Sequence, residues 1–505
     1  MADRAELSGQ IRRGIAWVGL ASGAVGALDA VTTVICLWRW VSPAELGTAT
    51  IASAMFPVIE RIATLGLGSA AVRSEPDRRT LSTIAWTALC ASLGVLGLAL
   101  AASGAIGRLF TPIVGGLMIG YAIRLVVQNA YLIPEALLRK ELRFDAIAGV
   151  RIAAMIADSL AKLGAAYAGA HGFPELRIWC FVIGPLANVV VTAIGLVACR
   201  PWWPALAFDP RAARRALGFG VQVSLGELLY FLYTSADYLV IGRVFGDAAV
   251  GAYRLAYELV LDLVRLVSMV TGEVAFAAFA RLAGDRAAAA ALLVRFTRQN
   301  LLAIAPILVV IGVCADDWLA LLYPSLARLD GAGGAAAGGS AIGQAAAAAR
   351  ILCAVGALRA ASFVLPPMLA GIGHARDALL YNLIAAIALP AGFVVAAAAF
   401  PAHGYLSVAA AWAVVYPLAF SFVLAAALAR TGVSLARYLR ATAPVIASAA
   451  VAAAAALVAR ALAPEVAGLR VLAVTGAAIA VYAPLVRWFG LGVRRSRRSS
   501  AADRT

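Results

Sequence analysis

The segment RWVSPAELG at residues 39–47 returns as RVFGDAAVG at residues 243–251, and the two align without a gap. Continuing in the same register pairs Arg61 with Arg265. In each copy a long apolar stretch precedes the first arginine, and another follows the final glycine. The repeated unit is therefore a helix, a short polar corner and a second helix. Parallel repeats of this kind are typical of transporters with two halves around one pathway.

The composition places the chain in a membrane. Hydrophobic residues make up 63% of the sequence, charged residues make up 13%, and the mean hydropathy is +0.91. Soluble domains are about 45–50% apolar and about 25% charged, so lipid must solvate this excess of apolar side chains. The net charge of +16 requires no nucleic-acid partner. Membrane topology and attraction to anionic lipid headgroups account for it.

Cysteines, histidines and known phosphate loops give no sign of a cofactor. The six cysteines lie in apolar segments without short paired spacings, and the three histidines fall in separate predicted loops. We therefore predict no metal, no cofactor and no catalytic residue. A loop ending in Gly-Lys-Ser or Gly-Lys-Thr does not occur in the sequence either. Energy for transport must then come from an ion gradient or from consumption of the product.

Apolar runs long enough to cross about 30 Å of hydrocarbon predict an all-α polytopic membrane protein with about fourteen transmembrane helices. The predicted spans are residues 14–38, 46–72, 81–103, 112–136, 147–170, 178–199, 217–241, 249–278, 300–323, 347–371, 378–400, 405–429, 441–461 and 470–488. The first run follows Arg12 and Arg13 as a secretory signal would, but it is long for a signal. Its repeat partner is internal, so we expect a retained span.

A repeat of six spans keeps its orientation in the membrane. We therefore predict two parallel, pseudo-symmetric six-helix bundles that rock around a central cavity, followed by two further helices. The predicted parts are an N-terminal bundle at 1–200, a cytoplasmic linker at 201–216, a second bundle at 217–430, two additional helices at 431–490 and a basic cytoplasmic tail at 491–505. Arginines gather in alternate loops, which places both termini in the cytoplasm. The Gly/Ala-rich stretch at 331–349 has the composition of a flexible insert.

Ionisable residues inside the predicted spans are the candidate site residues, because each costs about 2.5–3.5 kcal/mol at the bilayer centre. The candidates for a lumen site are Glu60, Arg61, Arg124, Glu227, Asp237, Arg254, Glu258, Asp262, Arg265 and Arg359. The four from Arg254 to Arg265 follow steps of four, four and three, which predicts one face of a helix. The alternative is that such charges only neutralise one another within a helix, as Asp158 and Lys162 would at i and i+4.

Several motifs resemble the bacterial oligosaccharide flippases, the polysaccharide-transport branch of the multidrug, oligosaccharidyl-lipid and polysaccharide exporter superfamily. They are the Arg-x3-Pro-x3-Gly corner in residues 38–68, ALLRKELRF at 136–144, ADYLVIGR at 236–243 and GAYRLA at 251–256. The resemblance implies a transporter and not an enzyme. Its substrate would be undecaprenyl-diphosphate-linked oligosaccharide, moved across the bacterial inner membrane during capsule, exopolysaccharide or O-antigen assembly. Implied partners are membrane lipids, a coupling cation or proton, a polysaccharide polymerase and glycosyltransferases.

Under this resemblance the candidate arginines bind the lipid diphosphate and the glycan, because guanidinium groups form charge-assisted, often bidentate contacts with phosphate. The candidate acids bind sugar hydroxyls or a coupling cation. Two alternatives stay open. A drug/cation antiporter of the same superfamily would share the two-bundle plan but favour acidic lumen sites. An integral-membrane polysaccharide polymerase or ligase would use the same glycan but carry a large outer loop with catalytic basic residues.

Overall fold

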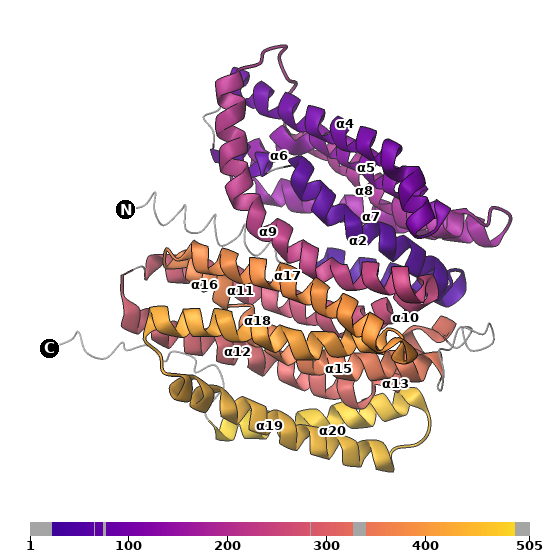
Figure 1. The fold of residues 1–505 in the computed structure, drawn as a ribbon, viewed down its shortest axis with the longest axis vertical. Helices are drawn as coiled ribbons and strands as arrows, with labels where there is room; N and C mark the ends of the chain where they lie inside the picture. The colour runs from indigo at the N-terminus through magenta and orange to yellow at the C-terminus, as the bar shows by residue number, and fades with distance from the viewer. Residues whose placement is uncertain (1–22, 65, 74–76, 283, 327–339, 490–505) are drawn as a thin grey trace. The chain divides into compact units, whose positions relative to one another are not determined.

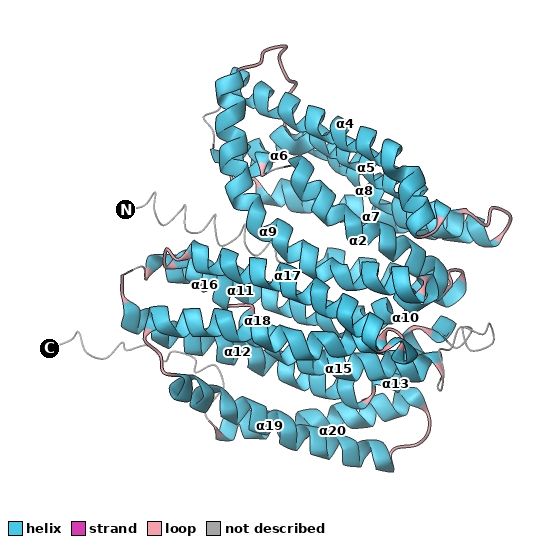
Figure 2. Ribbon diagram, in the orientation of Figure 1, coloured by secondary structure: helices cyan, strands magenta, loops and turns pink. Residues whose placement is uncertain are grey.

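The computed structural model describes residues 23–64, 66–73, 77–282, 284–326 and 340–489. Every regular element in these ranges is a helix (Figures 1 and 2). Ten of the helices are long and apolar enough to cross a membrane. The prediction of an all-α polytopic membrane protein is therefore confirmed, while the count of fourteen spans stays a prediction. Three predicted features lie outside the described residues: residues 14–22 of the first span, residues 331–339 of the insert, and the basic tail.

The ten candidate spans overlap ten of the predicted ones, although the helix that matches the predicted span 300–323 begins at Arg286 and ends at Val313. They are Arg78–Leu109 (α4), Pro112–Lys140 (α5, Pro112–Gln128, and α6, Leu132–Lys140), Leu176–Cys199 (α8), Ser224–Phe245 (within α9, Pro210–Phe245), Arg286–Val313 (α12), Ala341–Gly371 (α15, Ala341–Ser362, and α16, Leu365–Gly371), Ala375–Ala399 (α17), Leu406–Thr431 (α18), Leu435–Leu462 (α19) and Ala467–Trp488 (α20).

The other four predicted spans are helical where they are described; the first is described only in part, and the other three are broken or less apolar. The first is a helix over residues 23–39. The others correspond to α2 (Pro43–Thr64) with α3 (Leu67–Arg73), α7 (Phe144–Ala170), and α10 (Asp247–Tyr257) with the π-helical turn η2 (Glu258–Asp262) and α11 (Leu263–Arg281). Short helical turns complete the described chain: η1 (Asn129–Tyr131), α13 (Ala315–Leu322), η3 (Pro324–Leu326) and η4 (Pro401–His403).

Side-chain caps fix where several of these helices begin. Asp77, Asp209, Asp285 and Ser434 each precede a helix and accept a hydrogen bond from a backbone N–H of its first turn. These bonds satisfy donors that have no partner inside the helix. At Asp77, hydrogen bonds from Thr80 lower the pKa of the carboxyl. The cap is therefore ionised at neutral pH, and its contribution is lost as the pH falls through the lowered pKa.

The chain divides into two compact units. Unit 1 contains residues Met1–Tyr257, Leu322–Ala348 and Leu379–Ala419. Unit 2 contains residues Glu258–Leu321, Ala349–Ala378 and Phe420–Thr505.

In unit 1 the two copies of the repeated segment meet directly, because α2 packs along α10 (Figure 1). A Cβ atom on Gly47 would overlap the carbonyl oxygen of Asp247, and a Cβ atom on Gly251 would overlap that of Pro43. The Thr48 hydroxyl donates a hydrogen bond to the Asp247 carboxylate. We call this approach of residues 43–48 to residues 247–251 the corner contact. It exists because the last residue of each repeated segment has no side chain.

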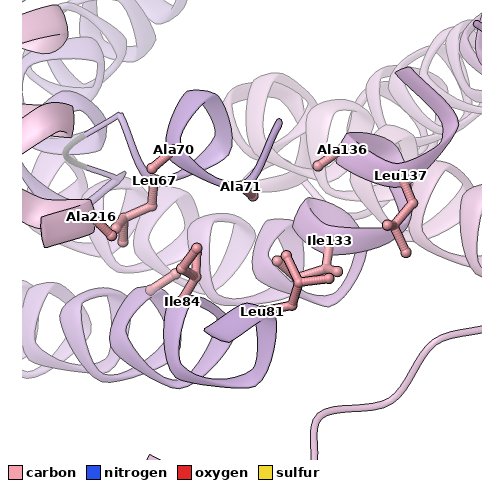
Figure 3. Packing of buried hydrophobic residues seen from close by; sticks show 10 residues of the cluster. Leu67, Ala70, Ala71, Leu81, Ile84, Ile133, Ala136, Leu137 and Ala216 are labelled. Atoms are coloured by element: carbon pink, nitrogen blue, oxygen red, sulfur yellow. The ribbon is translucent and has the colours of Figure 1, made fainter. Parts of the chain in front are cut away.

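A buried apolar cluster joins α3, α4 and α6 to the first turns of α9 in unit 1 (Figure 3). Its members include Leu67 of α3, Ile84 of α4, Ile133 of α6 and Ala216 of α9. The helix α9 therefore begins on the helices of the first half. Its first residue, Pro210, lies within the segment expected to be a linker.

The Gly/Ala-rich stretch is not a loop throughout. The helix α15 begins at Ala341, so the prediction of a flexible insert is wrong for residues 341–349. Alanine has the highest intrinsic helix propensity, and six of these nine residues are alanine. The Ser340 hydroxyl accepts a hydrogen bond from the Gly343 N–H, which caps the helix.

In unit 2 the last two helices pack on α12 (Figure 1). Val310 and Val313 of α12 share a buried cluster with Ala456 of α19 and with Val474 and Ala478 of α20. The two alanines among them let the helix backbones approach closely, as small residues usually do between membrane helices.

An ion-pair network on α13 holds α19 and α20 against other helices of unit 2. Asp316 pairs with Arg350 of α15 and, at 2.9 Å, with Arg460 of α19. The buried Asp317 pairs with Arg470 of α20 at 3.1 Å. Removing one partner from such a pair leaves the other charge uncompensated, so the network fixes how α19 and α20 attach.

Candidate functional site

A polar cavity of about 270 Å³ lies in unit 1 between the end of α2, the start of α3 and the α5–α6 segment. Its lining residues are Glu60, Arg61, Thr64, Gly66, Gly68, Gln128, Asn129, Tyr131, Leu132, Glu135, Ala136 and Arg139. They offer two guanidinium groups, two carboxylates, two amides and two hydroxyls. Such a set can bind both phosphate oxygens and sugar hydroxyls.

Breaks in two helices create this cavity. The α2 helix ends at Thr64, and Gly66 takes a φ of +64°, which suits glycine and separates α2 from α3. Between α5 and α6, the residues Asn129–Tyr131 form a single 3₁₀ turn. The polar side chains at these two breaks therefore line the cavity between the helix ends.

Arg61 lies in the last turn of α2 and reaches α9. Its Nη1 atom lies 2.9 Å from Oε2 of Glu227, and its guanidinium lies 5.6 Å from the ring centroid of Phe231. The two charged side chains are 36% and 51% exposed. Two of the predicted site residues are thus brought together by an ion pair that solvent can reach.

Two more predicted residues lie where α2 meets α5. The Gln128 amide donates a hydrogen bond of 3.0 Å to Glu60. The Arg124 guanidinium lies 5.0 Å from the ring centroid of Phe56. Its buried Nε atom has no hydrogen-bond partner in the described part of the chain. A cationic group with a spare donor therefore lies one helical turn from a wall of the cavity.

Arg254 connects α10 to α2. Its Nη1 atom donates a hydrogen bond of 2.7 Å to the hydroxyl of Thr50, a buried residue of α2. This contact lies about three helical turns from Arg61 along the same helix. Arg254 is therefore part of the packing between α2 and α10, the second helices of the two repeat copies.

Asp237 is completely buried, and its carboxylate is engaged by the protein itself. It accepts hydrogen bonds from the Tyr253 hydroxyl at 2.8 Å, the Trp412 indole at 3.0 Å and the backbone N–H of Tyr238 at 2.9 Å. These contacts are those of an anchor between α9, α10 and α18. Binding of a sugar hydroxyl or a coupling cation by Asp237 stays a prediction.

The remaining candidates lie in unit 2, and one prediction about them is wrong. The steps from Arg254 to Arg265 assumed a continuous α-helix, but Glu258–Asp262 form a π-helical turn. A π turn contains an extra residue, so these positions do not stay on one α-helical face. Asp262 and Arg265 form a half-exposed ion pair of 3.2 Å. Arg359 is buried, with 8% of its surface exposed.

The expected pair between Asp158 and Lys162 is present, but it is one part of a larger arrangement. Lys162 lies 3.5 Å from Asp158 and 2.7 Å from Asp29 of the helix over residues 23–39. Lys162 and Asp158 are buried, whereas Asp29 is half exposed. One ammonium group thus compensates two carboxylates in the first half of the chain.

Replacing Lys162 with methionine is expected to lower the free energy of unfolding by about 3–5 kcal/mol, because Asp158 would lose its compensating charge while it stays buried. Thermal unfolding of the purified protein measures this loss. The double variant Asp158→Asn with Lys162→Met should recover part of the stability, since it leaves no unpaired buried charge. Equal melting temperatures for the single variant and the unchanged protein would contradict the argument.

Sequence reasoning missed most of the cavity lining. Gln128, Asn129 and Tyr131 form a polar interruption of an apolar run, and this interruption was a readable signal. Glu135 binds two arginines, Arg139 at 2.7 Å and Arg151 at 2.9 Å, and only three-dimensional packing brings the second of them near. Among the described residues no group of three or more His, Cys, Asp or Glu could hold a metal ion.

Comparisons with known proteins identify relatives of the chain. A family described as "Polysaccharide biosynthesis protein" matches residues 36–325. Over 280 residues the chain is 22% identical to the lipopolysaccharide biosynthesis protein WzxC of Escherichia coli (strain K12), covering 54% of this chain and 55% of that protein. Over 317 residues it is 24% identical to the succinoglycan biosynthesis transport protein ExoT of Rhizobium meliloti (strain 1021), covering 62% and 63%. The chain thus spans less than two thirds of the length of either relative.

Two solved structures share the fold. The lipid II flippase MurJ in an inward closed conformation has a TM-score of 0.72 at 13% identity, covering 94% of this chain and 98% of that one. An inward-facing multidrug resistance MATE family transporter has a TM-score of 0.60 at 16% identity, covering 81% and 96%. At these identities the likeness shows the fold alone. The family match, in contrast, extends over more than half of the chain and includes both the cavity and the corner contact. The chain therefore belongs to this family of polysaccharide biosynthesis proteins.

Proposed function

We propose that this chain is a flippase that moves undecaprenyl-diphosphate-linked oligosaccharide units from the cytoplasmic to the periplasmic leaflet of the bacterial inner membrane. The observation that carries the proposal is the polar cavity that holds Arg61 inside the region shared with the family. A diphosphate is anionic and suits arginine, and the neighbouring amides and hydroxyls suit sugar hydroxyls. The product would feed capsule, exopolysaccharide or lipopolysaccharide O-antigen assembly.

The relatives support transport over catalysis. One is called a succinoglycan biosynthesis transport protein, and the structure with the same fold over 94% of the chain is called a lipid II flippase. Under the proposal the protein transports its substrate chemically unchanged. Glycosyltransferases would supply the substrate, and a polysaccharide polymerase would consume it.

The ion pair between Arg61 and Glu227 suggests how the cavity receives its ligand. A solvent-reached pair of this kind contributes only about 0–1 kcal/mol, so a ligand of higher negative charge can displace the carboxylate. Glu227 then acts as a placeholder that keeps Arg61 neutralised while the cavity is empty. Arg124 and Arg254 contribute further positive charge in unit 1.

The other predicted residues keep their proposed roles. Arg265 and Arg359 add positive charge for the lipid diphosphate and glycan from unit 2. The acids Glu60, Asp237, Glu258 and Asp262 bind sugar hydroxyls or a coupling cation or proton. The proton or cation gradient, or consumption of the product, drives net movement.

Alternating access would expose the cavity first to one leaflet and then to the other. In this proposal two six-helix bundles, residues 1–200 and 217–430, rock against each other. The helices at 431–490 are an addition to this core, and both termini face the cytoplasm. Rocking would break and reform the corner contact in each cycle.

Reconstitution in liposomes tests the proposal. Purified protein is inserted into vesicles with fluorescent undecaprenyl-diphosphate oligosaccharide, and the label that reaches the opposite leaflet is measured by a membrane-impermeant quencher. Movement faster than in protein-free vesicles is expected. No movement above that background, with native lipid and an imposed ion gradient, would reject the flippase. Transport of cationic drugs in its place would favour a drug/cation antiporter, and a longer glycan product would favour a polymerase or ligase.

A further inference from the structure

The segment between the two halves is held close to the first turns of α4. The Trp86 indole donates a hydrogen bond of 2.9 Å to the carbonyl of Ala205, and the Ala205 N–H donates one of 2.9 Å to the Ser82 hydroxyl. The Asp209 N–H donates a bond of 3.0 Å to Thr83. Three hydrogen bonds over five residues fix the course of this segment. We call residues 201–215 the strap.

Because the strap is held in this way, its apolar side chains divide into two groups. Trp202 packs inward against the buried cluster of α3, α4, α6 and α9. Trp203, Leu206 and Phe208 point away from it and are 71%, 96% and 52% exposed. Three large apolar side chains within six residues would be unfavourable in water.

Three arginines follow directly on the same strap. Arg211, Arg214 and Arg215 are exposed in the first turns of α9, whereas Ala212 and Ala213 on the opposite side are buried. The arginines and Asp209 line a hollow of about 580 Å³. The surface therefore combines apolar tips with an excess of positive charge.

The strap also lies at the level of a membrane boundary. It begins where the candidate span Leu176–Cys199 ends. It touches the first residues of another candidate span, Arg78–Leu109, and it leads into α9, which contains the candidate span Ser224–Phe245. Aromatic and basic side chains are the residues that membrane proteins place at this level.

We propose that the strap is a docking surface for the anionic phospholipids of the leaflet next to it. Trp203, Leu206 and Phe208 insert between headgroups, and the three arginines bind lipid phosphates. Apolar side chains beside clustered basic ones are the combination by which surface segments bind anionic membranes. The proposal is independent of the transported substrate, so failure of the flippase assay leaves it standing.

The first test asks whether Trp203 touches lipid. The full chain is placed in nanodiscs of phosphatidylcholine with phosphatidylglycerol, and the emission of Trp203 is obtained as the difference between the unchanged protein and Trp203→Phe. Lipids brominated near the headgroup end of the acyl chain should quench this difference, and aqueous iodide should not. Quenching by iodide and not by brominated lipid would overturn the proposal.

The second test asks whether the arginines recognise charge. Phosphatidylglycerol added to the detergent-purified protein should raise its melting temperature. Each Arg→Gln change at 211, 214 or 215 should lower the apparent affinity for this lipid about fivefold. This factor is the binding contribution of one basic residue near an anionic membrane surface. The triple Arg→Lys variant keeps the charge and should keep the effect.

Equal affinities in the triple Arg→Gln variant and the unchanged protein would overturn the proposal. So would protection of Trp203 from iodide that appears only in native membranes and is lost in purified nanodiscs, because a protein partner and not lipid would then cover the strap. Neither readout depends on transport.

Discussion

Replacing Gly47 with alanine is expected to abolish flipping and to lower the free energy of unfolding by about 1–3 kcal/mol, the usual cost of overpacking. The new methyl group would overlap the carbonyl oxygen of Asp247, a backbone atom that cannot rotate away. The α2 and α10 helices would then separate at the corner contact. Gly251→Ala should act in the same way through Pro43. Thermal unfolding and the liposome assay measure the two effects.

The α4 helix supplies matched controls for these variants. Apart from the adjacent residues and the backbone of α4 itself, no heavy atom of the described chain lies within 4 Å of a Cβ atom built on Gly94 or Gly97. Alanine there is expected to leave flipping unchanged and to raise the free energy of unfolding by about 0.5–1 kcal/mol. The reason is that alanine loses less backbone freedom than glycine when the chain folds into a helix. If Gly47→Ala melted and transported like Gly94→Ala, the corner contact would not be a constraint on the transport cycle.

Replacing Arg61 with glutamine is expected to slow flipping about 10- to 100-fold at limiting substrate. A hydrogen bond to a charged group contributes about 1.5–3 kcal/mol, and each 1.4 kcal/mol is a factor of ten. Stability should change by less than about 1 kcal/mol, since the pair with Glu227 is exposed to solvent. Liposome transport at matched protein levels measures the loss. Arg108→Gln, at an exposed position at the end of α4, is the control and should transport normally.

The partner residue separates binding from structure. If Glu227 is a placeholder, Glu227→Gln should leave transport intact or raise substrate affinity, because Arg61 loses its competitor. If Glu227→Gln slows transport as much as Arg61→Gln does, the ion pair itself is required and the placeholder role is wrong. Normal transport by Arg61→Gln would remove Arg61 from the proposed site.

The repeated segment shows how much of the fold and of the site could be predicted from the sequence. Its two copies correctly predicted a helix, a corner and a second helix in each half, since period and composition are local properties. They also singled out Arg61, which does line the cavity. They could not reveal that Gly47 and Gly251 face each other's helices, because nothing in either segment encodes its neighbour in space.

Long-range contacts account for the other differences. The pairing of Arg61 with Glu227 and of Arg254 with Thr50 joins residues more than 160 positions apart. The π-helical turn at 258–262 leaves no mark in a hydrophobicity pattern, so the sequence predicts one α-helical face from Arg254 to Arg265 where the structure has a π turn in between. Asp237 looked like a lumen acid in sequence because its three hydrogen-bond donors come from the backbone beside it and from two other helices.

The bond between Lys162 and Asp29 also bears on the order in which the chain is built. Its two residues are 133 positions apart, so the ribosome makes the helix over residues 23–39, the first predicted span, long before α7. During that interval Asp29 has no lysine to pair with, and a carboxylate at membrane depth makes insertion less favourable. Lys162 can offset this cost only after α7 has been translated. Synthesis of α7 then completes an assembly step as well as a span.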